Sequence, residues 1–131
     1  MKTPEIISKH LKDRLSPIAH LFQKKTYLLS ELHGIKPASF ICPGVYIFSR
    51  NNQVIRIGKS KTNCIKRSLE HIRDNTRGGE PFFEMKSLID DETCTVSYIF
   101  TRDTSAYFWV SSIEYFFEEN LSPLIPSKRN G

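Results

Sequence analysis

Two short runs of β-branched and aromatic residues flank an asparagine-rich turn, and this pattern constrains the fold more than any other. The runs are VYIF at residues 45–48 and VIRI at residues 54–57, and residues 50–53 between them read RNNQ. Such runs favour strands, and a short asparagine-rich turn is typical of the link between two antiparallel strands. The pattern therefore predicts a β-hairpin whose second strand ends at Gly58.

The sequence after the hairpin predicts a helix, a third strand and a second helix. The first helix spans about residues 63–75, with Asn63 or Thr62 as its cap. Residues 93–101 (TCTVSYIFT) form the strand, and a helix follows over about residues 104–120. Each helix carries an apolar stripe at helical spacing, which is Ile65, Leu69 and Ile72 in the first and Ala106, Val110, Ile113 and Phe117 in the second.

Residues 1–40 are expected to form a helical extension that packs on the rest of the domain. Residues 3–5 (TPE) supply an N-cap threonine, a first-turn proline and a first-turn acid. Apolar residues then recur at helical spacing over residues 7–22, and Pro17 predicts a kink or a fresh helix start. A further short helix is expected over about residues 26–33.

Length and composition fit one globular domain. The chain has 131 residues, of which 39% are hydrophobic and 25% charged, and this composition is typical of a folded protein. No uncharged apolar run approaches the roughly 18 residues of a membrane-spanning helix. The N-terminal sequence MKTPEIISKH carries charges where a signal peptide is apolar. We therefore expect a cytoplasmic protein that does not bind a membrane.

Basic residues are concentrated in one part of the chain, whose net charge is +5. Residues 50–77 hold eight Lys or Arg and two acids, a local charge of +6, whereas residues 80–92 hold five acids and one Lys, a local charge of −4. A basic segment binds polyanions because neutralised phosphates release counterions, although a solvated helix face is the commoner explanation for such a stretch alone. The candidate nucleic-acid-binding residues are Arg56, Lys59, Lys61, Lys66 and Arg73.

Several polar residues on the expected elements are of the types that phosphodiester cleavage requires. Cleavage needs a group that removes a proton from water, positive charge at the phosphate, and a carboxylate that can hold a divalent metal. Each residue alone has a simpler explanation as a core aromatic or a solvated charge, and only the combination favours a nuclease. The set is Tyr46 in the first strand, Arg56 and Lys59 in or just after the second, Arg67 and His71 on the first helix, and Glu114 on the last.

The order and spacing of these motifs resemble the GIY-YIG nuclease domain. Residues 44–46 read GVY, residues 56–60 read RIGKS, and residues 66–71 read KRSLEH. Further along, residues 113–117 read IEYFF and are followed by SPLI. The resemblance covers about residues 43–131 and leaves the N-terminal extension outside it.

The resemblance implies an α+β fold in which residues 43–131 form a small three-stranded antiparallel sheet flanked by helices. It also implies a metal-dependent endonuclease that hydrolyses phosphodiester bonds in DNA at a single-metal site, with Mg²⁺ or Mn²⁺ as cofactor. By this resemblance, Tyr46 would act as the general base or relay to it. Arg67 would contact the scissile phosphate, and His71 would lie one turn further on. Glu114 would hold the metal.

Two positions depart from the family's pattern. The second motif usually begins with tyrosine and here begins with Arg56, and the asparagine usually found after the last helix is replaced by Pro126. Arg56 adds a phosphate-binding fork and is expected to lower the pKa of a nearby Tyr46 phenol.

These departures leave three interpretations of the chain. It is a retuned endonuclease, a noncatalytic nucleic-acid-binding scaffold, or a protein-interaction module whose contact is the acidic stretch at residues 80–92. The sequence leaves RNA open beside DNA as the partner. It also leaves open a homodimer held by residues 1–40, which a single-site enzyme would need to cut both strands at once.

Overall fold

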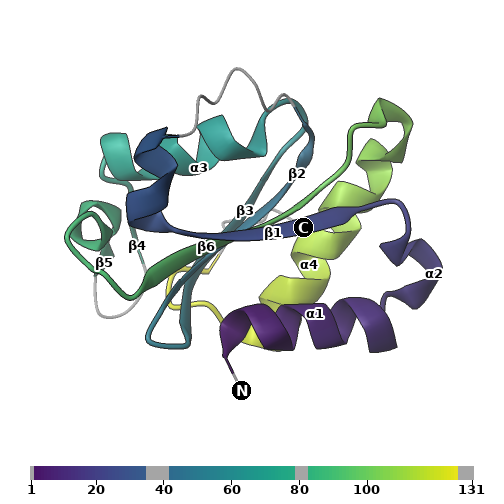
Figure 1. Cartoon of the computed structure of the whole chain (residues 1–131), viewed down its shortest axis with the longest axis horizontal. Coiled ribbons are helices and arrows are strands. Elements are labelled where there is room, and N and C mark those ends of the chain that lie inside the picture. Colours follow the sequence, from purple (N-terminus) through teal and green to yellow (C-terminus); the bar gives the residue numbers. More distant parts are fainter. Residues whose placement is uncertain (1, 35–41, 79–82, 127–131) are drawn as a thin grey trace.

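A four-stranded antiparallel sheet with helices on both faces forms the protein (Figure 1). The structure, a computed structural model, describes residues 2–34, 42–78 and 83–126. The strand order is β1-β6-β2-β3, and a separate pair, β4 and β5, lies beside it. The elements are α1 (Thr3–Asp13), α2 (Ser16–Ala19), β1 (Gln23–Leu28), the 3₁₀ helix η1 (Leu29–Gly34), β2 (Gly44–Arg50), β3 (Gln53–Ser60), α3 (Cys64–Arg73), β4 (Arg77–Gly78), β5 (Phe83–Glu84), η3 (Met85–Leu88), β6 (Cys94–Phe100), η4 (Thr104–Ala106) and α4 (Tyr107–Leu121).

The predicted hairpin is confirmed as β2 and β3. Arg50 pairs with Gln53, so the turn consists of Asn51 and Asn52 alone. Both asparagines have positive φ, 50° and 62°, which suits the primed turns that match the twist of a hairpin and explains why asparagine is found here. The register shifts after Phe48, so that β3 carries one extra residue.

The prediction of a helix over residues 26–33 is wrong. Residues Gln23–Leu28 form β1, which pairs antiparallel with β6 along its length, and only the 3₁₀ helix η1 follows. The Thr26 and Ser97 hydroxyls are 2.9 Å apart across these strands, and the Tyr27 ring lies 6.1 Å from that of Tyr98. The sheet therefore has four strands where three were expected, and the described part of the N-terminal extension, residues 2–34, is only partly helical. The mixed α+β class is confirmed.

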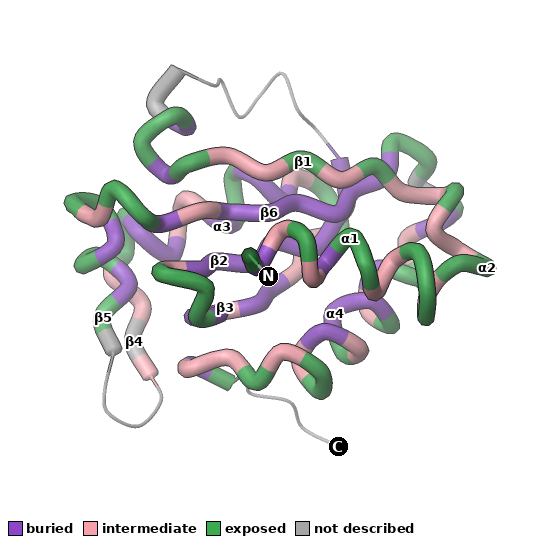
Figure 2. Tube along the Cα trace, turned by 60° about the horizontal axis from the view of Figure 1, so that its bottom comes forward, coloured by how far each residue is buried: buried purple, intermediate pink, exposed green. Residues whose placement is uncertain are grey.

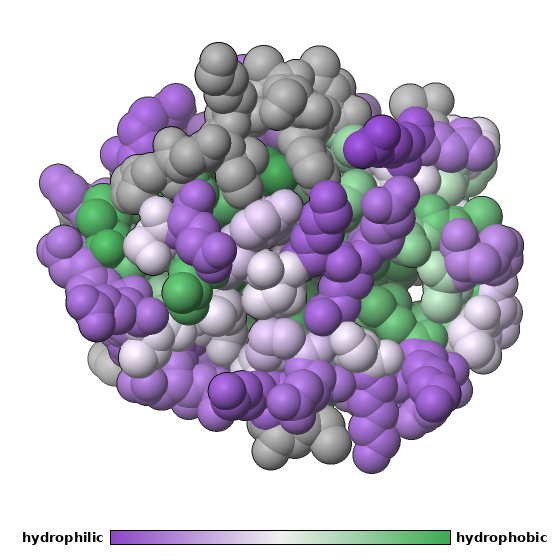
Figure 3. Space-filling model, in the orientation of Figure 1, coloured by the Kyte–Doolittle hydropathy of each residue, from purple (hydrophilic) through white to green (hydrophobic). Residues whose placement is uncertain are grey.

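The sheet separates two apolar cores. Alternate residues of β2 point to opposite faces, so Tyr46 and Phe48 enter the core beneath α3 while Val45 and Ile47 enter the core beneath α1 and α4. Figure 2 shows β2 and β6 buried over almost their whole length, whereas α1 exposes its outer side. On the face in Figure 3, hydrophilic residues cover most of the described surface and apolar ones show between them.

The N-terminus of α3 has the expected capping side chain, whereas that of α1 does not. The Asn63 side chain accepts a hydrogen bond from the Lys66 amide at 3.0 Å and caps α3. Thr3, expected as the cap of α1, is instead its first residue, and its Oγ1 accepts a hydrogen bond of 3.0 Å from Ser49. Lys2 holds the cap position. No helix among the described residues is long and apolar enough to cross a membrane.

The N-terminal helix contributes directly to the core, and this can be tested at Ile7. Ile7 is fully buried among residues of β2, β3 and α4, whereas its neighbour Ile6 is only half-buried. We expect Ile7→Ala to lower the free energy of unfolding by about 2–4 kcal/mol, because it leaves a cavity in the core. Urea denaturation measures the change, with Ile6→Ala as the matched control. Equal losses for the two variants would show that α1 is not part of the core.

Candidate functional site

The ring of Tyr46 lies across the glycine of the second motif. Tyr46 in β2 pairs with Gly58 in β3, and it is only 2% exposed. A Cβ atom added at Gly58 would collide with the ring and the hydroxyl of Tyr46. The glycine is therefore required because it leaves room for the tyrosine, and the two motifs form one packed unit.

A chain of hydrogen bonds leads from Tyr46 back to the second motif. The Tyr46 hydroxyl lies 2.7 Å from Nε2 of His71, and Nδ1 of the same ring lies 2.8 Å from Oγ1 of Thr76. Arg56 donates a hydrogen bond of 2.9 Å to that same oxygen. Arg56 is thus joined to Tyr46 through two intermediate residues, His71 and Thr76.

Thr76 is the residue that sequence reasoning does not identify. Asn75 takes a left-handed conformation (φ 47°) just after α3, and its amide donates to Ile72 while the Thr76 amide donates to His71. These two bonds form a Schellman motif, a common helix ending. The motif brings the Thr76 side chain back to the His71 ring. Asparagine near the end of a predicted helix is the signal that could have located the turn.

Burial has the largest effect on the pKa values of the two titratable groups in this hydrogen-bonded chain, His71 and Tyr46. It lowers the pKa of His71 to about 4, and the positive charges of Arg56 and Arg67 add to that effect, so His71 is neutral at pH 7. Burial also raises the pKa of Tyr46 to about 12. Arg67 and Arg56 do lower the Tyr46 pKa, as expected for Arg56, but the loss of hydration outweighs both. The expected effect of Arg56 is therefore present, but burial sets the net direction of the Tyr46 pKa shift.

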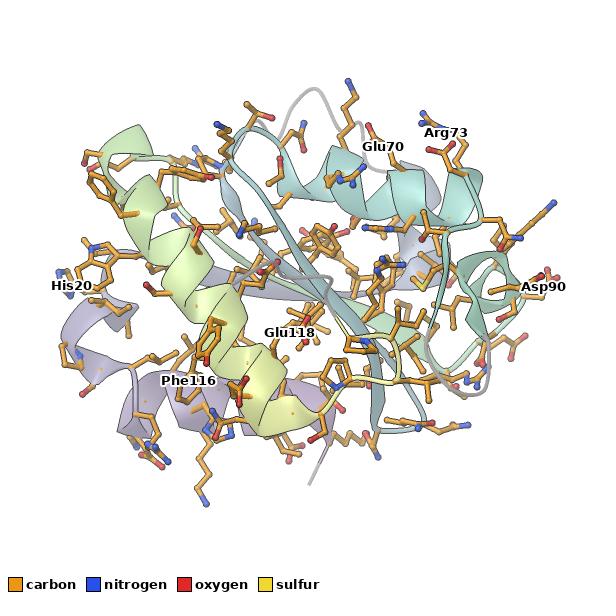
Figure 4. All side chains as sticks on the ribbon, turned by 180° about the vertical axis from the view of Figure 1, so that it is seen from behind. His20, Glu70, Arg73, Asp90, Phe116 and Glu118 are labelled. Atoms are coloured by element: carbon orange, nitrogen blue, oxygen red, sulfur yellow. The ribbon has the colours of Figure 1, made fainter. Side chains whose placement is uncertain are left out.

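Glu114 approaches the same site from α4. Glu114 is only 6% exposed, and its carboxylate lies 3.6 Å from Nζ of Lys59 and close enough to Tyr46 for its charge to raise the tyrosine pKa. Burial lowers the pKa of Arg56, and the negative charge of Glu118, one turn after Glu114, opposes that shift. Glu118 lies on the side of α4 that faces β3 (Figure 4). The site therefore lies along β3, with α3 on one side and α4 on the other.

The remaining basic candidates are spread around this centre. Arg67 is half-exposed and pairs with Glu70 at 3.0 Å, but its charge also acts on Tyr46 and His71. The fold thus brings Arg67 to the site, whereas three other basic candidates do not join the hydrogen bonds between Tyr46, His71, Thr76 and Arg56. These three are Lys61, whose Nζ lies 5.8 Å from the Tyr107 ring, the exposed Lys66, and Arg73, which pairs with Asp74 at 2.8 Å and projects from the end of α3 (Figure 4).

The proline-containing segment after α4 returns to the edge of β3. Its backbone amides at Leu124 and Ile125 donate to the carbonyls of Val54 and Ile55 at 3.0 and 2.8 Å. Ile125 also pairs in parallel with Arg56. Pro126 therefore follows a segment that lies against the second motif, and its side chain has no group that replaces the asparagine amide.

The donor set fits a metal held mainly by the substrate. No group of three His, Cys, Asp or Glu side chains forms a ready metal site in the described parts of the chain. A magnesium ion often binds through one carboxylate together with waters and substrate phosphates, and Glu114 has the right chemistry for that single ligand. Lys59 then occupies the position of a counter-ion that a metal would have to displace.

Comparisons with known proteins do not extend this description. No family model, no curated protein and no solved structure matches the chain.

The buried, neutral state of His71 predicts a pH-dependent stability. Its pKa is about 4 in the folded chain and about 6.5 when unfolded, so the unfolded chain takes up the proton first as the pH falls. The free energy of unfolding should fall between pH 6.5 and pH 4, and His71→Gln should reduce that fall by roughly 2 kcal/mol after allowance for solvent screening. Urea denaturation at pH 7.5 and pH 4.5 measures it. His20→Gln, at an exposed position, is the control, and equal slopes for wild type and His71→Gln would contradict the prediction.

Proposed function

We propose that this chain is a metal-dependent endonuclease of the GIY-YIG type, which hydrolyses phosphodiester bonds in DNA. The observation that supports it most is the hydrogen-bonded chain from Tyr46 through His71 and Thr76 to Arg56, with the carboxylate of Glu114 nearby. The partner of the Tyr46 hydroxyl is a neutral imidazole, whose Nε2 can accept the phenol proton. That arrangement suits general base catalysis.

In this proposal the proton of the attacking water leaves through Tyr46. The water oxygen attacks phosphorus, the Tyr46 oxygen takes the water proton, and the Tyr46 proton moves to Nε2 of His71. The bond from phosphorus to the leaving sugar oxygen breaks, and that oxygen takes a proton from solvent. The concerted transfer avoids a free phenolate, which the Tyr46 pKa of about 12 makes unfavourable at neutral pH. His71, whose pKa is about 4, would hold the proton only transiently and release it to solvent, which returns the site to its starting state.

The transfer requires one tautomer of His71. Nε2 accepts a proton only if the ring hydrogen is on Nδ1, and this hydrogen then bonds to Oγ1 of Thr76. The Thr76 hydroxyl can direct its own hydrogen to the His71 carbonyl at 3.5 Å while it accepts from Arg56. Arg56 and Thr76 thus act as positioning residues for the imidazole.

The charges around the tyrosine suit a phosphate. Arg67, exposed on the α3 surface, and Lys59, after the second-motif glycine, can offer donors to phosphate oxygens. Glu114 would hold the Mg²⁺ or Mn²⁺ ion, which would stabilise the negative charge that develops on the phosphate and the leaving oxygen.

A second candidate is a module that binds nucleic acid without cutting it. Tyr46 is 2% exposed and carries a raised pKa, and Glu114 already has Lys59 as its partner. Both features favour this alternative. It requires salt-sensitive binding with no need for metal, because phosphate contacts alone would supply the affinity.

The test of the endonuclease is plasmid nicking with and without Mg²⁺ or Mn²⁺. We expect Glu114→Gln to reduce the cleavage rate by about 100-fold or more, because the carboxylate that holds the metal is lost, while DNA binding changes little. Glu118→Gln, one turn away on α4, is the matched control and should keep most of the activity. Cleavage by Glu114→Gln at the wild-type rate would overturn the proposal, and binding without cleavage under any metal would favour the second candidate.

The positioning role is tested at Thr76. Thr76→Val keeps the shape but removes the hydroxyl, and we expect the cleavage rate at saturating DNA to fall about tenfold or more while the dissociation constant changes less than about twofold. Thr76→Ser should restore the rate because it restores the hydroxyl. A loss of DNA binding in Thr76→Val, or no rescue by Thr76→Ser, would assign the residue a purely structural role.

A further inference from the structure

Helix α4 presents aromatic residues on the side away from the core. The core side is supplied by Val110, Ile113 and Phe117, all fully buried. On the outer side Phe108 is 80% exposed and Tyr115 is 53% exposed. Figure 4 shows α4 nearest to the viewer, with no other described element across its outer side.

The two outer rings lie on one face of the helix. Phe108 and Tyr115 are seven residues apart, close to two full turns, so they are separated by about 10 Å along the helix axis. Ser111 and Ser112 lie between them and are small. We call these four residues the aromatic stripe.

Cations flank the aromatic residues of α4 on both sides. Nζ of Lys61 lies 5.8 Å from the centre of the Tyr107 ring, and the Arg14 guanidinium lies 5.9 Å from that of Phe116. Phe116 lies on the side of α4 that faces α1, where it contacts the His10 ring at 5.4 Å (Figure 4). Exposed rings between cations match a single nucleic-acid strand, which carries stacking bases and negative phosphates.

The stripe is also continuous with the candidate site. Tyr115 directly follows Glu114, and one residue turns a helix by about 100°, so the ring lies next to the side that faces β3. Glu119, one turn after Tyr115, is exposed and would repel phosphates at that end. The Lys61 end is therefore the side on which phosphates would lie.

From these observations we infer that unpaired bases of a bound nucleic-acid strand stack on Phe108 and Tyr115, while its phosphates lie toward Lys61 and the basic residues along β3. The partner is single-stranded because the bases of an intact duplex stack on one another and do not offer their faces. The inference rests on the proposed nucleic-acid function, but not on cleavage.

The experiment measures binding of a mixed-sequence 20-nucleotide single-stranded DNA in EDTA, which removes cleavage. Phe108→Ala with Tyr115→Ala should weaken binding about tenfold or more, because each stacked base contributes substantially to affinity. The slope of affinity against salt should stay unchanged, since no phosphate contact is removed. Leu28→Ala with Ile89→Ala, at exposed apolar positions elsewhere, is the matched control and should bind as wild type does. Trp109, the single tryptophan, lies beside Phe108 and its fluorescence should be quenched on binding.

The outcomes separate this inference from the endonuclease. Unchanged single-strand affinity in the Phe108→Ala and Tyr115→Ala variant overturns the stacking, whether or not the protein cuts plasmid. Weakened single-strand binding in a protein that never cuts supports the stacking and removes only the endonuclease. A wild-type dimer that this variant dissociates, with DNA affinity unchanged, would assign the stripe to a second copy of the chain and overturn the inference. Phe108→Trp with Tyr115→Trp should retain binding, because each position still carries an aromatic ring on which a base can stack.

Discussion

The buried hydroxyl of Tyr46 fixes the arrangement of the whole site. A phenol removed from water needs a hydrogen-bond partner, and here the partner is His71 at 2.7 Å. The bond joins β2 to α3, so the helix must lie where its histidine reaches the strand. The ring itself requires a glycine opposite, at Gly58, so β3 is also constrained. One side chain therefore relates two strands and a helix that are separate in the sequence.

Arg56 changes how this centre is completed. A tyrosine at this position would offer a hydroxyl, whereas the arginine offers donors only and has to find an acceptor. It finds Thr76, whose hydroxyl also meets His71. The positive charges of Arg56 and Arg67 and the burial together keep His71 neutral. Arg56 is thus coupled to Tyr46 through Thr76 and the imidazole of His71.

Sequence patterns predict the hairpin, α3, β6 and α4, because each has strong local signals of strand alternation, capping or helical spacing. They do not predict β1, because QKKTYL lacks a clear period and becomes a strand only beside β6, which supplies its hydrogen bonds. Thr76 is missed because its position depends on the left-handed turn at Asn75. Sequence gives the direction of the Arg56 effect on the Tyr46 pKa but not the larger, opposite effect of burial, because sequence alone does not give the extent of burial.

Helix α4 presents a different set of side chains on each of its sides, because successive residues of a helix are rotated by about 100°. Its core side fixes it to the sheet, its adjoining side carries Glu114 and Glu118 toward β3, and its outer side carries Phe108 and Tyr115. Because successive residues differ by about 100°, Glu114 and Tyr115 occupy neighbouring sides at almost the same height. A nucleic-acid strand that crosses β3 and reaches the Glu114 carboxylate would therefore meet the exposed ring of Tyr115, which is the next residue of the helix. The rigidity that the core gives to α4 would then hold the proposed metal ligand and the proposed stacking surface in a fixed relation.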